Sequence, residues 1–262
     1  MFKRGIVAIA LMGLAIAFGG TTAKAEDTIK VGFSPEPYPP FYSKDAAGNW
    51  GGFEVDLLNA LCDEMKAKCV LTPVAWDGII PALTEKKIDM IFNSMSITDD
   101  RKKVIDFSDK YYNTPAVFIG AKNDDIKIDV NKPDSLKGKI VGVQTATIHA
   151  NYVQEKFGKT AEIKLYDTQD NANADLVAGR VDVLLADSIA LDAFLKSDQG
   201  KDYEVKYVAP DDPIFGDGVG AGLRKGDTAL KEKINAAIKA IRANGTYDKI
   251  AKKYFDFNVY GS

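Results

Sequence analysis

The stretch LTEKKIDMIFNSMSITDDR, residues 83–101, contains the repeating unit that decides the fold. A helical pattern over Asp77–Lys86, opened by Asp77, leads into the apolar run IDMIFNS, which is typical of a buried strand. Thr98, Asp99 and Asp100 then form a helix start, because a threonine N-cap followed by acids suits the positive end of a helix. The order helix, strand, helix predicts an α/β protein.

The same alternation continues on both sides of this stretch. Helical patterns run over 53–68 and along an apolar stripe at 230–241 that closes at Asn244-Gly245. Short β-rich runs predict further strands at 28–33, 69–74, 139–144, 162–167 and 181–187. Strands separated by helices favour a mainly parallel sheet with helices covering it.

Two segments of the chain resemble each other in layout. LTEKKIDMIFNS at 83–94 and LVAGRVDVLLAD at 176–187 each carry a leucine, a basic residue, an aspartate and an apolar strand with a polar end. One interpretation is coincidence between two ordinary helix-to-strand units. The other is two similar α/β lobes, in which case Ser94 and Asp187 occupy corresponding strand ends and face one cleft.

The first 25 residues have the features of a cleaved signal peptide. Lys3 and Arg4 precede an apolar segment at 5–19 that is too short to span a bilayer, and Ala23-Lys24-Ala25 fits a cleavage site. A transmembrane anchor is the alternative. We expect the mature chain to begin near Glu26.

Charge and length narrow the function classes. Loss of the three basic residues of the signal peptide lowers the basic count from 34 to 31 against 37 acids, so the net charge goes from −3 to −6. An acidic exported protein is not expected to bind nucleic acid. The glycine run at 216–222 is not G-x-G-x-x-G, so we expect no dinucleotide or other cofactor. The mature length fits one large domain or two of about 100–130 residues.

Cys62 and Cys69, in LCDEMKAKC, are the only two cysteines. An even pair this close in an exported protein predicts a disulfide, and two buried free thiols are the alternative. We expect no metal site, because His149 is the only histidine and no Cys/His cluster has the spacing of zinc ligands.

Polar residues stand at the end of the strand predicted at 88–94 and just after it. Ser94 and Ser96 offer hydroxyls, and Arg101 lies in the first turn of the next helix, where the macrodipole disfavours a cation. A bound anion would explain this placement. Hydroxyls, free backbone N–H groups and a planar guanidinium together suit a carboxylate.

These residues also have plainer interpretations. Thr98 could be a simple N-cap while Arg101 pairs with Asp99 or Asp106 on the surface. Asp187 ends an apolar strand, where it could hold an ammonium group, cap the following helix, or do both. A carboxylate site in one lobe and an ammonium site in the other would form a receptor for a free α-amino acid.

Several longer motifs resemble one family. They are SPEPYPPFYSKDAAGNWGGFEVDLLNALC, WDGIIPAL, IDMIFNSMSITDDR, VDVLLAD, GVGAGLRKGD and NGTYDKIAKKYFDFNVYG. Together they resemble the periplasmic polar amino-acid binding proteins of ABC transporters, chiefly the lysine/arginine/ornithine and histidine receptors, with opine receptors as relatives. The short cysteine pair matches that group, in which it forms a disulfide.

The resemblance implies a two-lobed periplasmic binding protein fold. Each lobe would have a mainly parallel sheet with helices on both faces, and two hinge strands would join the lobes. The implied division is 1–25 signal peptide, 26–113 and 218–262 lobe 1, and 114–217 lobe 2. It also implies a monomer in the periplasm of a Gram-negative cell that binds an amino acid and docks transiently on an inner-membrane ABC permease.

The resemblance also implies the ligand-binding residues. These are Glu36, Tyr38, Trp76, Ser94, Ser96, Arg101, Thr147, Ile148, His149 and Asp187. Tyr38 and Trp76 would hold the ligand side chain, Arg101 its carboxylate and Asp187 its α-ammonium. The two serines would bind the amino and carboxylate groups, and the turn at 141–149 would supply backbone N–H groups.

This chain departs from the family pattern at two places. The usual Gly-Thr-Thr turn is Ala146-Thr147-Ile148 here, so at most the backbone N–H of Ile148 is kept. His149 could reach the ligand or lie at the cleft rim, and we expect the rim. An acid before the tyrosine is displaced, which leaves Glu36 either turned inward to select a cationic side chain or solvated in its loop.

We therefore expect a receptor for arginine, ornithine, lysine or histidine, or for an opine. The main rival is a periplasmic enzyme, a dehydratase or a hydrolase, because serine hydrolases also use serine, histidine and aspartate. No G-x-S-x-G elbow is present, so we expect no catalysis. A sensor ectodomain would need a membrane anchor and a signalling domain.

Overall fold

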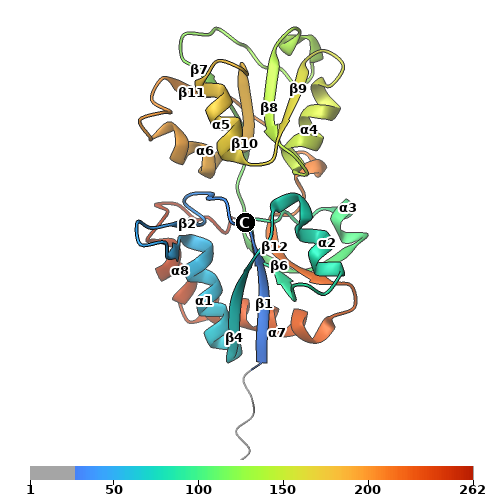
Figure 1. The fold of residues 1–262 in the computed structure, drawn as a ribbon, viewed down its shortest axis with the longest axis vertical. Coiled ribbons are helices and arrows are strands. Elements are labelled where there is room, and N and C mark those ends of the chain that lie inside the picture. The colour runs from blue at the N-terminus through green and yellow to red at the C-terminus, as the bar shows by residue number, and fades with distance from the viewer. Residues whose placement is uncertain (1–26, 262) are drawn as a thin grey trace, which may run out of the picture.

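The computed structural model describes residues 27–261, which form two lobes, each built on one five-stranded sheet (Figure 1). Lobe 1 has the strand order β4-β1-β5-β12-β6, and lobe 2 has the order β11-β7-β10-β8-β9. The predicted signal peptide lies outside the described residues. Between residues 27 and 261, no helix has the length and apolar character needed to cross a membrane.

The strands of lobe 1 are β1 (Asp27–Phe33), β4 (Ala67–Pro73), β5 (Met90–Ile91), β6 (Ile105–Tyr112) and β12 (Val219–Arg224). Those of lobe 2 are β7 (Ala116–Ala121), β8 (Ile140–Gln144), β9 (Glu162–Tyr166), β10 (Val183–Asp187) and β11 (Tyr203–Val208). The helices of lobe 1 are α1 (Phe53–Met65), α2 (Ile79–Thr84), α3 (Asp99–Lys102), α7 (Thr228–Ala243) and α8 (Thr246–Ala251). Those of lobe 2 are α4 (Ile148–Phe157), α5 (Gln169–Val177) and α6 (Ser188–Leu195). Short elements are β2 (Ser43–Lys44), β3 (Trp50–Gly51) and the 3-10 turns η1 (Trp76–Gly78), η2 (Pro133–Leu136) and η3 (Pro213–Phe215).

The two sheets share one topology. In lobe 1, β1 lies between β4 and β5 and is parallel to both, and β12 and β6 add two antiparallel neighbours beyond β5. In lobe 2, β8 lies between β9 and β10 and is parallel to both, and β7 and β11 add antiparallel neighbours beyond β10. The sheets are therefore mixed, and the predicted parallel order holds for the half that consists of strand–helix–strand units.

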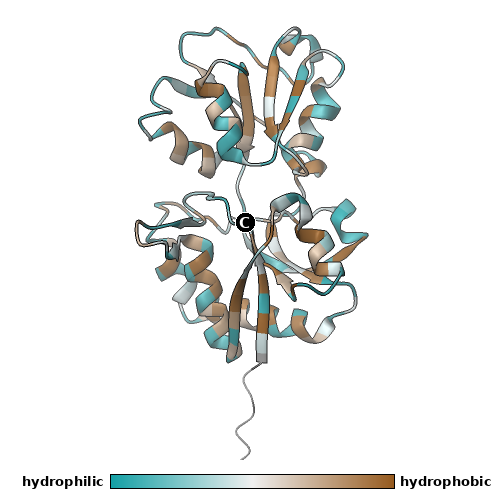
Figure 2. Ribbon diagram, viewed as in Figure 1, coloured by the Kyte–Doolittle hydropathy of each residue, from teal (hydrophilic) through white to brown (hydrophobic). Residues whose placement is uncertain are grey.

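Helices cover both faces of each sheet, as predicted. Along β10, Val183 and Leu185 pack into the core beside α4, whereas Leu184 and Ala186 pack into the core beside α5 and α6. Successive strand side chains point to opposite faces, so a strand covered on both faces has to be apolar throughout. Helices, which have one covered face, differ from such strands. Figure 2 shows that hydrophobic residues dominate the strands and alternate with hydrophilic residues along the helices.

The internal repeat has a physical counterpart at the start of two equivalent strands. The Asp89 N–H donates to Lys30 O at 2.8 Å, and the Asp89 carboxylate accepts from Lys30 N at 3.0 Å. Asp182 makes the same pair of bonds with Ile140, at 2.9 and 2.7 Å. These matching contacts favour two similar lobes over coincidence.

The predicted disulfide is present. Cys62 near the end of α1 and Cys69 in β4 are joined, so the bond links a helix to the sheet on which it packs. The chain passes between the lobes at 113–115 and at 209–218, and both connections contain prolines outside regular strands.

Two predicted helices differ in their bounds. The helix predicted over 53–68 ends at Met65, because Lys66 adopts a left-handed conformation with φ 50°. The helix expected to open at Asp77 starts as a 3-10 turn that contains Asp77, and it becomes α-helical only at Ile79.

The strand predicted over 88–94 pairs only at β5. Its neighbour Phe92 still bonds to β1, but Ser94 turns the chain away with φ 52°. The sequence interpretation also omitted β6, β7, β11 and β12, which supply all the antiparallel pairings of the two large sheets in the described chain.

Candidate functional site

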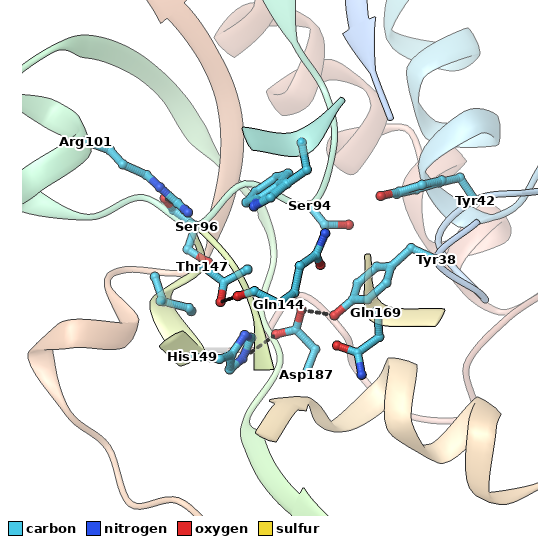
Figure 3. Close-up of a pocket in the computed structure, with 12 residues that line it drawn as sticks. Tyr38, Tyr42, Ser94, Ser96, Arg101, Gln144, Thr147, His149, Gln169 and Asp187 are labelled. Carbon is cyan, nitrogen blue, oxygen red and sulfur yellow. Dashed lines mark hydrogen bonds and ion pairs between the residues drawn. The ribbon is translucent and has the colours of Figure 1, made fainter. Parts of the chain in front are cut away.

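A cavity lies between the lobes, beyond the carboxyl ends of β5, β8 and β10 (Figure 3). Ligands of open α/β sheets bind at such strand ends. The described residues that line it are Tyr38, Tyr42, Trp76, Ser94, Ser96, Arg101, Gln144, Thr147, Ile148, His149, Gln169 and Asp187. Of the predicted ligand-binding residues, only Glu36 is missing from this set.

Arg101 enters the cavity from α3. Its backbone N–H donates to Thr98 Oγ1 at 3.2 Å, so Thr98 is the N-cap. Its guanidinium donates to the carbonyls of Ser96 at 2.9 Å and Ala146 at 3.2 Å, and lies 5.5 Å from the centre of the Trp76 ring. The cation is thus held by neutral groups.

The surface ion pair considered for Arg101 is wrong. Asp99 pairs with Lys102, and Asp106 pairs with Lys225. Among residues 27–261 no carboxylate forms a salt bridge with Arg101. Burial lowers the pKa of Arg101 to about 10, with Asp187 opposing that shift, so the guanidinium stays charged at neutral pH.

Ser94 is hydrogen-bonded, on the side away from the cavity, to a buried acid that the sequence interpretation did not identify. The Ser94 N–H donates to Glu54 Oε1 and its hydroxyl donates to Glu54 Oε2, both at 2.8 Å. Ser96, two residues on, bridges to β12 at Val219. The two hydroxyl-bearing residues are therefore fixed by different elements of lobe 1.

Lobe 2 presents the first turn of α4 to the cavity. The Thr147 hydroxyl caps this helix, because it accepts from Ala150 N at 3.0 Å and donates to Gln144 O at 2.7 Å. Its hydrogen is therefore used within the turn, and the groups left for a ligand are backbone N–H groups at Thr147 and Ile148. Ala146, where the family pattern has glycine, has φ 56°.

Asp187 ends β10 and lies against the cavity from lobe 2. Its Oδ2 accepts from Tyr38 OH at 2.7 Å, and its Oδ1 lies 3.5 Å from His149 Nε2. It occupies the N-cap position of α6, as considered from the sequence, but its side chain makes no cap bond to that helix within the described chain. Burial and Asp187 raise the pKa of Tyr38 well above its usual value, which keeps the phenol a donor.

His149 does not lie at the rim. It is 6% exposed, and its Nε2 has no hydrogen-bond partner within residues 27–261 although Asp187 faces it. The rim interpretation is wrong because the first turn of α4 points into the cleft, which carries His149 onto the cavity wall.

Glu36 is the predicted residue that the structure does not bring to the cavity. Its carboxylate accepts from Ser34 Oγ at 2.6 Å, within its own loop. The uncharged residues Tyr42, Gln144 and Gln169 line the cavity instead and were not predicted. Gln144 ends β8 and Gln169 begins α5, so the strand-end rule that identified Ser94 could have pointed to Gln144 as well.

The lobes touch across the cavity. Tyr38 OH reaches Asp187, Trp76 Nε1 donates to Thr145 O at 3.1 Å, and Arg101 reaches Ala146 O. Each of these bonds joins a residue of lobe 1 to a residue of lobe 2. The structure is therefore a closed arrangement.

A sequence profile of the bacterial extracellular solute-binding proteins, family 3, matches residues 29–257. The chain belongs to this family. The L-arginine-binding protein of Pseudomonas aeruginosa is 47% identical over 249 residues, which are 92% of this chain and 93% of that protein.

Two further relatives agree with this. The lysine/arginine/ornithine-binding periplasmic protein of Escherichia coli K12 is 43% identical, with 99% of each chain covered. Among solved structures, an ancestral arginine-binding protein bound to arginine superposes with a TM-score of 0.80 at 34% identity, over 88% of this chain and 99% of that one. The predicted family and two-lobed fold are thereby confirmed.

Proposed function

We propose that this protein is the periplasmic receptor of an amino-acid ABC importer and that it binds a free α-amino acid between its closing lobes. One observation carries the proposal. Arg101 faces the cavity without a salt-bridging carboxylate among the described residues, while Asp187 faces it from the other lobe. A zwitterionic head group would give Arg101 and Asp187 each a partner of opposite charge.

The positions of these two charged residues determine how the head group of the ligand is oriented in the cavity. The ligand carboxylate lies on the Arg101 fork and the backbone N–H groups at the start of α4, since both are donors aimed at the cavity. The ligand ammonium lies between Asp187 and the hydroxyl oxygen of Ser94, since both can accept. Binding therefore needs groups from both lobes, which favours the closed state.

The side chain of the ligand is cationic: arginine, ornithine, lysine or histidine. Tyr38 and Trp76 line the cavity with aromatic faces, and such faces attract cations. Gln144 and Gln169 add amide oxygens as acceptors. The names of the relatives, which bind arginine, lysine and ornithine, support the same class.

We also propose the lobe boundaries 26–113 with 218–262, and 114–217. The connections at 113–115 and 209–218 support them, because they lie between strands of different sheets. The signal peptide, the periplasmic location in a Gram-negative cell, the transient contact with the permease and a monomeric state belong to this proposal.

A receptor for an opine is the second candidate. A second pocket, lined by residues of both lobes, shares Tyr38 and Gln169 with the ligand cavity. A longer, modified amino acid could extend into it past those two side chains. Ile148, in place of a second threonine, also removes a hydroxyl from the family turn.

We infer no catalysis. A serine hydrolase needs histidine as the base beside the nucleophile. Here the Ser94 hydroxyl donates to Glu54, and His149 faces Asp187 instead. The arrangement of side chains therefore suits binding.

Native mass spectrometry of the purified protein, followed by calorimetry after ligand removal, tests the proposal. The panel is arginine, ornithine, lysine, histidine, glutamine, glutamate and nopaline. We expect the tightest binding within the cationic set. Tight binding of glutamate alone would contradict the ligand class, and no binding across the panel would contradict the function.

A further inference from the structure

A fully buried acid stands directly behind the ligand cavity. Glu54, on α1, is 0% exposed, and its carboxylate accepts from the Ser94 N–H, the Ser94 hydroxyl and the Tyr111 hydroxyl. Within residues 27–261 it forms no salt bridge with a cation. Of the two described residues that donate to Glu54, Ser94 lines the cavity and Tyr111 does not.

The protonation state of Glu54 determines which way the Ser94 hydroxyl points its hydrogen. An ionised carboxylate can only accept, so Ser94 donates to it and offers the lone pairs of its oxygen to the cavity. Two donors, Ser94 N–H and Tyr111 OH, meet at Glu54 Oε1. A proton on Glu54 therefore sits on Oε2 and donates to the Ser94 oxygen. The Ser94 hydrogen then turns toward the cavity.

We propose that Glu54 is a positioning residue that makes Ser94 an acceptor for the ligand ammonium, and that its protonation reverses Ser94 and weakens binding. The proposal rests on the proposed function, because it needs a ligand with an α-ammonium group beside Ser94. Glu54 itself does not line the cavity and is not expected to touch the ligand.

The surroundings of Glu54 place its titration in the physiological range. Burial raises the pKa of Glu54 to about 7, while the hydrogen bonds from Tyr111 and Ser94 oppose the rise and the charge of Asp187 adds to it. The other titratable groups that face it are Tyr42, Tyr111 and Tyr112, and burial raises the pKa of each well above its usual value. These phenols stay neutral, so near pH 7 only Glu54 changes charge in this cluster.

The sign of the pH dependence follows. A cationic ammonium at Ser94 favours the ionised carboxylate, so binding lowers the pKa of Glu54 and releases a proton. Affinity is greatest above the pH at which Glu54 is half protonated in the ligand-free protein. It falls as the pH drops below that value. The fall approaches about tenfold per pH unit if the complex excludes the proton entirely.

Calorimetry of wild type and Glu54→Gln with the tightest ligand of the panel, from about pH 5.5 to about pH 8, tests this. The two donors at Oε1 orient the glutamine with its oxygen there, so its NH₂ faces Ser94 and imitates protonated Glu54. We expect Glu54→Gln to bind at least tenfold more weakly than wild type at pH 8 and about equally at pH 5.5. Glu64→Gln, on the exposed face of α1, is the matched control and should follow wild type.

Proton release and a second variant separate this role from a structural one. Titration in buffers of different ionisation enthalpy should show about half a proton released near pH 7, and Glu54→Gln should lose that component. Tyr111→Phe removes one of the donors that stabilise the ionised carboxylate of Glu54. The pH at which affinity begins to fall should therefore move to a higher value.

The outcomes are distinct. If wild type binds the ligand and its pH profile and proton release match those of Glu54→Gln, the inference is wrong and the proposed function stands. An unmoved pH profile in Tyr111→Phe would also contradict it. If wild type binds nothing in the panel, the proposed function and the inference are both wrong.

Discussion

Tyr38 of lobe 1 and Asp187 of lobe 2 meet across the cavity, with the phenol donating to Asp187 Oδ2 at 2.7 Å. The bond has two consequences. It holds the lobes together, and it occupies one oxygen of the carboxylate that would bind the ligand ammonium. The other oxygen, Oδ1, faces His149 at 3.5 Å and lacks a strong partner. The ligand would therefore find Asp187 already oriented.

Tyr38→Phe should weaken ligand binding. The variant keeps the aromatic face but removes the bond that orients Asp187, and a hydrogen bond to a charged group contributes about 1.5–3 kcal/mol. We expect Kd to rise by about 10- to 100-fold in calorimetry, and solution scattering should show a more open free protein. Tyr254→Phe is the control, because Tyr254 OH donates to Asp56 away from the cavity. Equal affinities of Tyr38→Phe and wild type would show that this bond does not assist binding.

Arg101→Ala should nearly abolish binding. The ligand carboxylate would lose its guanidinium partner, and breaking a buried ion pair costs about 3–5 kcal/mol, which is two to four decades in Kd. Arg101→Lys should fail too, because a point charge cannot replace the planar fork. Lys103→Ala, at the end of the same helix, is the control, since Lys103 pairs only with exposed Asp100 in the described chain. A change of less than about threefold in either Arg101 variant would refute the carboxylate role.

The sequence was informative where local chemistry decides the structure. The strand predicted at 181–187 forms β10 at Val183–Asp187, which is buried throughout, and Ile234, Ile238 and Ile241 of the predicted stripe on α7 are buried. The omitted strands carry weaker signals: β6 has three charged residues, Asp106, Asp109 and Lys110, among its apolar ones, and β12 has glycines that pack closely against Ile97 and Ile91. Their pairing partners are far away in sequence, so only the tertiary structure specifies them.

The residues of the candidate site also divide into those that local sequence could predict and those that only the fold reveals. Arg101 and Asp187 could be found because each follows an apolar strand and has an unexpected charge. Glu54 could not, because in sequence it looks like one of the acids of a first helical turn, and only the fold buries it against Ser94. Glu36 was misplaced for the opposite reason, since Ser34 lies close enough in the loop to bind it.

Reduction of the Cys62–Cys69 bond should destabilise the protein without preventing binding. The closed loop is short, so the chain-entropy model gives about 2–3 kcal/mol. For a protein of this size that corresponds to a decrease of about 5–10 °C in Tm. Calorimetric melting with and without a reductant measures this. The bond joins α1 to β4 and does not line the cavity, so Kd should be unchanged. Loss of binding on reduction would show that the disulfide supports the site.

Glu36→Gln should leave affinity within about twofold for both arginine and glutamine. A Glu36 turned inward, one of the two interpretations of the sequence, would give a selective loss for cationic ligands, but the carboxylate accepts from Ser34 outside the cavity. Asp187→Asn is the comparison, because it neutralises the acid that lines the cavity. A selective loss of arginine binding in Glu36→Gln would show that Glu36 turns inward when the ligand is bound.

Trp76 should select a cationic side chain through its ring face. Trp76→Phe and Trp76→Leu both lose the bond from Nε1 to Thr145 O, but only the leucine variant loses the aromatic face. A desolvated cation–π contact contributes up to about 2 kcal/mol. For arginine, we therefore expect Trp76→Leu to bind about 10- to 30-fold more weakly than Trp76→Phe, and for neutral glutamine the two variants should differ by less than about threefold. Calorimetry with both ligands on both variants measures the difference. If the affinities for arginine and glutamine fall equally, the Trp76 ring provides only apolar area. The preference for a cationic side chain then has another source.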